Sequence, residues 1–267
     1  MDRPVWQDLH DEAVRCGEGH YIDPATGYHV FTEAFHLERG TCCASACRHC
    51  PFAHERVDPK YKKLRTWAPT LFKRSIDSER PVDIVFWSGG KDSWLAWQAS
   101  EREGRQCVWL TTFDPIDHRV PIQSIPIEDI IRQADRAGRS LVVTPIDPER
   151  PWVESVTAGL DVIAKRCDVA HLVFGDLWLE DVRAKRDEAF GAWASAHGAE
   201  VVFPLWEKPT AALLSELFAA NVQVHISASY VDDVSTGEVF DEALVRRLPD
   251  SVDPMGERGE FHTQVAW

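Results

Sequence analysis

Six consecutive residues, Ser88-Gly89-Gly90-Lys91-Asp92-Ser93, combine the side chains and the setting that suit the binding of a phosphate group. They follow the apolar, β-prone run 82–87 and precede the helix-compatible run 94–102, so the sequence predicts a strand, a loop and a helix in that order. The glycines allow backbone N–H groups to approach an anion closely, and the serine hydroxyls, the lysine ammonium and the helix dipole add further attraction. The alternative is a solvated Gly-Gly turn, but the context favours a nucleotide-phosphate site.

Two later stretches carry polar side chains that could take part in chemistry with a nucleotide. Gly175-Asp176-Leu177 directly follows a strand predicted at 170–174, which would place the Asp176 carboxylate at the edge of the sheet; helix capping is its alternative role. The stretch 256–263 gathers two glutamates and a histidine, namely Glu257, Glu260 and His262. Taken alone, this last stretch is equally typical of an exposed, charged turn.

Strands and helices alternate along most of the chain after residue 80. Apolar, β-prone segments predict strands at 82–87, 107–113, 140–146, 170–174, 200–206 and 222–227. Segments with helical periodicity predict helices at 92–103, 126–137, 152–166, 209–220 and 241–248. Since the strands are continuously apolar, we expect a Rossmann-like α/β fold, in which helices cover both faces of a parallel sheet. The predicted domains are a small Cys-rich domain at 1–75, a nucleotide-binding α/β domain at 80–205 and a C-terminal α/β extension on the substrate side at 206–267.

Four of the seven cysteines lie within nine residues, at Cys42, Cys43, Cys47 and Cys50. In a reducing compartment such crowding predicts metal or redox chemistry rather than disulfides. The last three have a spacing that can hold an iron–sulfur cluster, whereas the four thiolates, or some of them with His49 or His54, could bind Zn²⁺. A small domain with several buried thiols and no metal is the third interpretation.

The composition favours a soluble, cytoplasmic protein. The 267 residues are 44% hydrophobic and carry a net charge of −14, which argues against a general nucleic-acid-binding protein. The first residues are polar and acidic, so no secretory signal is expected, and no apolar run is long enough to cross a bilayer. Residues 56–74 are rich in Lys and Arg; this pattern favours a solvated linker over a strip that guides RNA.

The Ser88–Ser93 loop resembles the Ser-Gly-Gly-x-Asp-Ser signature of the PP-loop ATP pyrophosphatases, within the adenine-nucleotide α-hydrolase-like (HUP) superfamily. Over 82–263 the chain resembles the diphthine–ammonia ligase (diphthamide synthase) family, because the stretches 175–183 and 256–263 recur in that family's order. Gln123 and Met255 depart from the pattern, since close relatives have a histidine and a cysteine there. The N-terminal block is outside this pattern and resembles a Cys-rich domain of unknown function.

The resemblance implies an ATP-dependent ligase that releases AMP and pyrophosphate. An acceptor carboxylate would attack the α-phosphorus, and ammonia would then displace AMP to form an amide. The residues that it implies for binding ATP and Mg²⁺ are Ser88, Gly89, Gly90, Lys91, Asp92, Ser93, Gly175 and Asp176. Those that it implies for catalysis are Lys91, Asp92, Asp176, Glu257, Glu260 and His262.

Two other functions fit the same residues. One is a tRNA-modifying, sulfur-transfer enzyme, in which the loop adenylylates a base and the cysteine cluster handles sulfur or a metal cluster. The other is a sensor that binds a nucleotide or a metal without catalysis. The expected partners are ATP and an acceptor that is a protein side chain, a small molecule or tRNA. A homodimer is a further expectation, and no membrane partner is expected.

Overall fold

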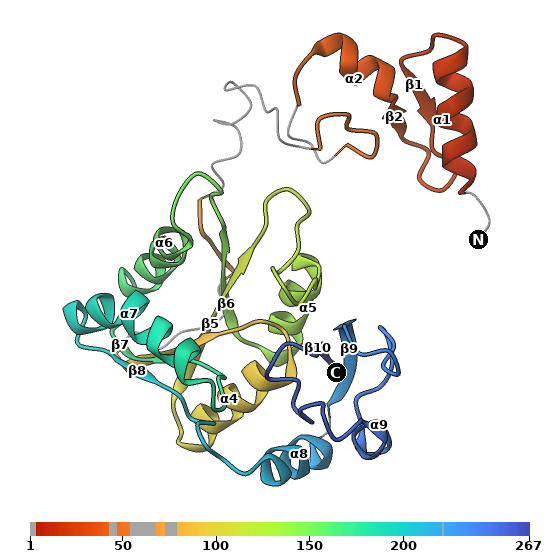
Figure 1. The fold of residues 1–267 in the computed structure, drawn as a ribbon. Coiled ribbons are helices and arrows are strands. Elements are labelled where there is room, and N and C mark those ends of the chain that lie inside the picture. Colours follow the sequence, from red (N-terminus) through yellow and green to blue (C-terminus); the bar gives the residue numbers. More distant parts are fainter. Residues whose placement is uncertain (1–3, 43–46, 54–67, 73–78, 221) are drawn as a thin grey trace. The chain divides into compact units, whose positions relative to one another are not determined.

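The computed structural model describes residues 4–42, 47–53, 68–72, 79–220 and 222–267. The chain divides into two compact units, Met1–Thr66 and Trp67–Trp267. The first contains short strands and helices, and the second contains a large central sheet (Figure 1). Within the described residues, no helix is both long enough and apolar enough to span a bilayer.

The described residues of the N-terminal unit form two helices and a two-stranded antiparallel sheet. Its elements are α1 (Val5–Arg15), β1 (His20–Ile22), β2 (His29–Phe31) and α2 (Glu33–Arg39). The Thr32 side chain caps α2 by accepting a hydrogen bond from the N–H of Phe35, and Gly40 ends the helix with a left-handed φ of 77°. Both helices are additional to the elements that the sequence pattern predicts.

The larger unit is built on a six-stranded sheet in the order β3-β6-β5-β4-β7-β8. Its strands are β3 (Thr70–Phe72), β4 (Val82–Phe86), β5 (Gln106–Phe113), β6 (Ser140–Pro145), β7 (Val169–Val173) and β8 (Glu200–Val202). Among these described strands, the edge strand β3 alone pairs antiparallel, and the others are parallel. The predicted Rossmann-like α/β fold is confirmed.

Helices cover both faces of this sheet (Figure 1). One face carries α4 (Lys91–Arg102) and α5 (Ile127–Ala137), and the other carries α6 (Trp152–Ala164) and α7 (Glu180–Ala196). Side chains alternate between the two faces of the sheet along β4 and the residue that follows it, and both faces are buried. Val85 and Trp87 pack in the core under α4 and α5. Val82 and Ile84 pack in the core under α6 and α7.

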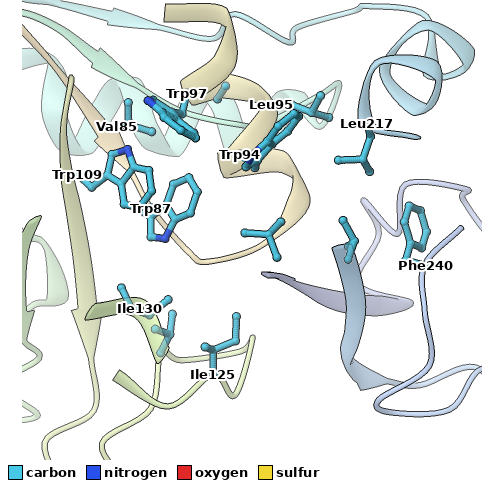
Figure 2. Packing of buried hydrophobic residues seen from close by; sticks show 14 of the residues in the cluster. Val85, Trp87, Trp94, Leu95, Trp97, Trp109, Ile125, Ile130, Leu217 and Phe240 are labelled. Atoms are coloured by element: carbon cyan, nitrogen blue, oxygen red, sulfur yellow. The ribbon is translucent and has the colours of Figure 1, made fainter. Parts of the chain in front are cut away.

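A cluster of tryptophans joins α4 to the sheet (Figure 2). The rings of Trp87 and Trp109 are stacked with their centroids 3.6 Å apart, and the Trp97 ring meets both of them edge-on. Trp94 is buried as well. Trp94 and Trp97 therefore belong to the hydrophobic core.

The C-terminal segment adds a small antiparallel sheet and two helices to the layer that contains α4. Its elements are α8 (Thr210–Ala219), β9 (Gln223–Ser229), α9 (Glu242–Arg247) and β10 (Phe261–Ala266). Two predicted strands are corrected here. The strand expected at 200–206 ends at Val202, because Pro204 lies in the turn that follows. The strand expected at 222–227 pairs with β10 and does not extend the parallel sheet.

Candidate functional site

The strand order of the sheet reverses beside β4. From β4 the chain adds β5 and then β6 on one side, and it then crosses over to place β7 and β8 on the other side. The carboxyl ends of β4 and β7 therefore flank a crevice of the kind in which open α/β sheets bind their ligands. The loop that contains Ser88–Ser93 leaves β4, and the loop that contains Gly175 and Asp176 leaves β7, so two of the predicted stretches meet there.

The loop after β4 is fixed partly by its own residues and partly by the distant strand β10. Gly89 has a left-handed φ of 85°, and the Ser93 hydroxyl donates a hydrogen bond to the Gly90 carbonyl at 2.9 Å. Gly90 is the N-cap residue of α4 and supplies no capping side chain. The N–H of Lys91 instead donates to Oγ1 of Thr263 at 3.1 Å. A residue near the C-terminus therefore caps the helix that begins at the loop.

The side chain of Lys91 is buried, with 2% of its surface exposed. Its Nζ lies 2.9 Å from Oδ2 of Asp92, and it faces the rings of Phe240 and Phe261 at 5.9 and 5.7 Å from their centroids. The other carboxylate oxygen of Asp92, Oδ1, is buried and has no hydrogen-bond partner among the described residues. Such a carboxylate is costly to bury, and a cation bound at Oδ1 would relieve that cost.

Asp176 lies just beyond β7, where its Oδ2 is 3.5 Å from Nε of Arg186. Leu179 occupies the N-cap position of α7, so Asp176 does not cap that helix. Burial raises the pKa of Asp176, and the charge of Asp92 raises it further, whereas Arg186 lowers it. Gly175 permits the close approach of this loop to α4, because a Cβ there would lie 2.8 Å from the backbone C and O of Asp92.

Glu257 joins the C-terminal loop to the loop after β7. Its Oε1 accepts a hydrogen bond from the N–H of Leu177 at 2.9 Å. Burial raises the pKa of Glu257 to about 7, and the nearby charges of Asp92 and Asp176 also raise it. This carboxyl group therefore changes its protonation state close to neutral pH, which is what a proton-transfer group needs.

His262 and Glu260 have different environments in the same loop. His262 lines the cavity, and burial together with the charge of Lys91 lowers the pKa of its ring, so that it is neutral at neutral pH. The Glu260 carboxylate instead accepts hydrogen bonds from the N–H groups of Asp253 and Arg258 at 2.9 and 3.0 Å. These contacts give Glu260 a part in shaping the loop; the catalytic role that the resemblance implied for it stays a prediction.

Together these residues surround a cavity of about 530 Å³. The predicted site residues that line it are Ser88, Gly90, Lys91, Asp92, Ser93, Gly175, Asp176, Glu257 and His262, whereas Gly89 and Glu260 do not. Much of the remaining lining comes from the ends of β5 and β6 and from α6, including Leu110, Thr111, Ile146, Trp152 and Val156. Thr111 is buried, and its hydroxyl has no partner in the described part of the chain. A cavity that combines charged and apolar walls in this way suits a nucleotide.

Gln133 of α5 supports the loop after β4, although the sequence analysis did not single it out. Its side chain is 4% exposed. Its Oε1 accepts a hydrogen bond from Nε1 of Trp87 at 2.8 Å, and its Nε2 donates to the carbonyls of Gly89 at 3.2 Å and Val265 at 2.7 Å. The N–H of Val265 also donates to the Gly89 carbonyl at 2.8 Å. A polar residue on the apolar side of an amphipathic helix is the signal that could have indicated it.

The predicted metal ligands of the N-terminal unit are placed in part. Cys42 is buried, and Cys47 and Cys50 are partly buried, whereas Cys43 lies outside the described residues, as do His54 and most of the basic run at 56–74. The Sγ atoms of Cys42 and Cys50 are 3.7 Å apart. In the part of the chain that the structure describes, no three His, Cys, Asp or Glu side chains are arranged around a common point as a metal ion would require.

The fold and the crevice define the larger unit as a Rossmann-like α/β domain with a candidate ligand site at its switch point. Residues 9–56 match a family described as "Family of unknown function (DUF5522)", which agrees with the Cys-rich domain that the sequence indicates. The chain is also similar to a solved structure described as a predicted subunit of tRNA methyltransferase from Methanocaldococcus jannaschii. The sequence identity is 15% and the TM-score is 0.38, with 70% of this chain and 96% of that chain covered.

Proposed function

We propose that the protein is an ATP-dependent enzyme of the PP-loop type, which transfers AMP to an acceptor carboxylate and then forms an amide. The observation that carries this proposal is the position of the Ser88–Ser93 loop at the switch point of the parallel sheet and at the N-terminus of α4. A glycine-rich loop that opens a helix favours phosphate groups. The acidic residues and the histidine that line the same cavity add groups for holding a cation and for proton transfer.

The cavity has a polar part suited to the triphosphate of ATP and an apolar part suited to its adenosine. The triphosphate would lie against the N-terminus of α4, where the helix dipole and Lys91 attract anions. The adenosine would extend toward the apolar lining around Leu110 and Ile146. There the buried Thr111 hydroxyl, which has no described partner, could form a hydrogen bond with it. Leaving a buried polar group unbonded costs about 1–3 kcal/mol, so a ligand that bonds to this hydroxyl would gain affinity.

The acidic residues of the cavity fit a hard, oxygen-binding cation such as Mg²⁺. Asp92, whose Oδ1 has no described partner, lines the same cavity as Asp176 and Glu257, and its charge raises the pKa of both. Proteins hold Mg²⁺ with one or two carboxylates together with substrate phosphates and water. Asp92 and Asp176 are the residues that would hold the ion, which when bound would neutralise charge on the phosphates.

The first step that we assign to this site is adenylylation. An oxygen of the acceptor carboxylate attacks the α-phosphorus, and the bond from that phosphorus to the oxygen that bridges to the β-phosphate breaks. Pyrophosphate leaves with the electron pair, and the acceptor becomes an acyl-adenylate. Nζ of Lys91 and the N-terminus of α4 stabilise the charge that develops on the leaving pyrophosphate. For this purpose Lys91 must exchange its contact with Asp92 for one with the phosphates.

The second step that we assign is formation of the amide. Ammonia attacks the carbonyl carbon of the acyl-adenylate, AMP leaves with the electron pair of the broken C–O bond, and the nitrogen loses a proton. The neutral ring of His262, and Glu257 with its pKa of about 7, are suited to accept this proton at neutral pH. The Glu260 carboxylate helps to hold the loop that carries both side chains.

The test uses the full-length protein with α-³²P-labelled ATP, ammonium chloride and a dialysed cell extract as the source of the acceptor. We expect AMP and pyrophosphate in equal amounts, and a trapped hydroxamate when hydroxylamine replaces ammonia. Lys91→Ala should lower the rate by about 10²–10³. Lys185→Ala, which removes an exposed lysine of α7, should leave the rate unchanged. Release of ADP, or a Lys91→Ala rate equal to that of the wild type, would overturn the proposal.

The same assay identifies the kind of acceptor. If ribonuclease treatment of the extract abolishes release of AMP, the acceptor is an RNA, and adenylylation of a base replaces formation of an amide. If the protein binds ATP without turnover in every extract, it is a sensor and the proposed enzymatic function is wrong.

A further inference from the structure

The N-terminal unit contains a group of thiols that the proposed reaction does not use. Cys42 is 1% exposed, and its Sγ lies 3.7 Å from the Sγ of Cys50. A disulfide would hold these atoms at about 2.05 Å. Two thiolates that bind one tetrahedral ion at about 2.3 Å each are about 3.8 Å apart. The observed separation is that of a hydrogen bond from the Cys50 thiol to the Cys42 sulfur, and it also matches the spacing of two neighbouring ligands in a tetrahedral metal site.

Cys47 and Cys50 belong to one turn. The N–H of Cys50 donates a hydrogen bond to the carbonyl of Cys47 at 3.2 Å. Cys-x2-Cys is a usual spacing for a pair of zinc ligands. The sulfurs of Cys42, Cys47 and Cys50 do not surround a common point in the described structure. Completion of a site on these three residues therefore requires the Cys47 side chain to turn toward the other two sulfurs.

The other polar side chains of this turn are engaged elsewhere. Nε2 of His49 lies 3.0 Å from the hydroxyl of Tyr21, and its ring stacks on that of His10 with the centroids 3.8 Å apart. Arg48 donates a hydrogen bond to Oδ2 of Asp23 at 2.6 Å. These contacts hold the turn in place and engage His49 and Arg48 with residues of α1 and β1 and with Asp23.

Few hydrophobic side chains are buried in the described part of this unit. Its buried hydrophobic side chains, among the described residues, are Ala13, Tyr21 and Cys42. Domains of this size bury little apolar surface, and many small domains add a disulfide or a structural metal to their core. The described cysteines of this unit form no disulfide. A bound metal would add to the stabilisation that the described apolar contacts supply.

We propose that Cys42, Cys47 and Cys50 bind a single Zn²⁺ ion that links the segment after α2 to the turn at 47–50. Thiolate ligands select zinc over the hard cations Mg²⁺ and Ca²⁺. Binding would be coupled to folding of the N-terminal unit, because the ligands are brought together by the fold. The proposed reaction does not use these three thiols, so the test of zinc binding does not depend on turnover of ATP.

The test measures metal in the full-length protein, purified without chelators. We expect about one equivalent of Zn²⁺ by plasma mass spectrometry, and after exchange with Co²⁺ the charge-transfer and d–d absorption bands of a tetrahedral thiolate site. Cys42→Ser and Cys50→Ser should each lower the zinc content several-fold. Cys16→Ser, which removes an exposed thiol of the same unit, should leave the zinc content unchanged.

A second measurement on the wild-type protein is informative even if a variant fails to fold. With Zn²⁺ bound, Cys47 and Cys50 should react with N-ethylmaleimide several-fold more slowly than after chelation, as measured by peptide mass spectrometry. Cys16 should react at the same rate in both states. A protein that contains no metal and shows equal rates would overturn the proposal, and so would a coloured protein that contains iron and acid-labile sulfide.

Discussion

The backbone N–H of Lys91, at the start of α4, donates a hydrogen bond to Oγ1 of Thr263, which lies 172 residues later in the chain, at 3.1 Å. The N-cap residue of α4 is a glycine without a capping side chain, so a threonine of β10 takes over that function. The same C-terminal segment brings Glu257 and His262 to the cavity. Packing of β10 onto the loop therefore completes both the start of the helix and the wall of the candidate site.

Thr263→Val should weaken the helix start and the binding of nucleotide together. Loss of an N-cap costs about 1 kcal/mol and up to about 2 kcal/mol, so we expect the free energy of unfolding to fall by that amount. We also expect weaker binding of ATP by calorimetry, because the N–H of Lys91 loses the bond that fixes it. Thr263→Ser keeps the hydroxyl and should retain most of both properties. If the valine variant matches the wild type in urea unfolding and in ATP affinity, the bond has no positioning role.

Gln133→Glu should destabilise the larger unit, because a carboxylate cannot donate the hydrogen bonds that Nε2 gives to the carbonyls of Gly89 and Val265. The Gly89 carbonyl keeps its hydrogen bond from the N–H of Val265, whereas the Val265 carbonyl loses the one from Gln133. An unsatisfied buried group costs about 1–3 kcal/mol, so we expect the free energy of unfolding to fall by about that amount. The emission of Trp87, whose Nε1 donates to this side chain, should change as well.

The matched control for Gln133→Glu is Gln223→Glu, the same change at an exposed position of β9. It should alter the free energy of unfolding by no more than about 0.5 kcal/mol. Equal urea midpoints for the two variants would show that the network around Gln133 does not stabilise the loop.

The positions of the loop Ser88–Ser93 and of Asp176 could be predicted, because the sequence patterns that indicate them are local. The glycines of Ser88–Ser93, the strand before them and the helix after them are contiguous in the sequence. Asp176 directly follows a strand, and parallel βα units place such positions at one edge of the sheet. The same local patterns predicted the parallel sheet, which the structure confirms.

Contacts between distant segments could not be predicted in this way. The charged residues before β10 are typical of a turn, and nothing in that stretch indicates that Thr263 and Val265 will bond to residues of the loop after β4. Gln133 bonds to Trp87 and Gly89 after β4 and to Val265 of β10, so its role follows from the tertiary fold alone. The Glu260 carboxylate accepts hydrogen bonds from backbone N–H groups close to it in the sequence. The residue type alone did not indicate this structural role.

Glu257 should make the stability of the ligand-free protein depend on pH. Folding raises the pKa of this carboxyl group from 4.5 to about 7, so between these values the folded state holds a proton that the unfolded state releases. The resulting stabilisation is complete below the unfolded value and is lost as the pH rises through the folded value. Glu257→Gln carries no such proton. We therefore expect the wild type to lose thermal stability relative to Glu257→Gln as the pH rises from about 5 to about 8. A difference in Tm that stays constant over this range would contradict the raised pKa.

The substitution of glycine by alanine should have opposite effects at Gly175 and at Gly191. A Cβ on Gly175 would lie 2.8 Å from the backbone C and O of Asp92, so the start of α4 would have to shift. A Cβ on Gly191, inside α7, meets nothing within 4 Å. We expect Gly175→Ala to lower the free energy of unfolding by about 1–3 kcal/mol. Gly191→Ala should raise it by about 0.5–1 kcal/mol, because alanine loses less backbone entropy in a helix.

The same pair of variants tests whether the crevice binds the nucleotide. Gly175→Ala moves the loop after β7 away from Asp92, so ATP should bind about tenfold more weakly or worse, since small displacements of positioned groups are costly. Gly191 lies away from the cavity lining, and its alanine variant should bind ATP as the wild type does. Calorimetric titration of both folded variants with ATP and Mg²⁺ measures the effect. If Gly175→Ala retained wild-type affinity, the close approach of Gly175 to Asp92 would have no part in binding, and the ligand would have to contact the cavity through its other walls.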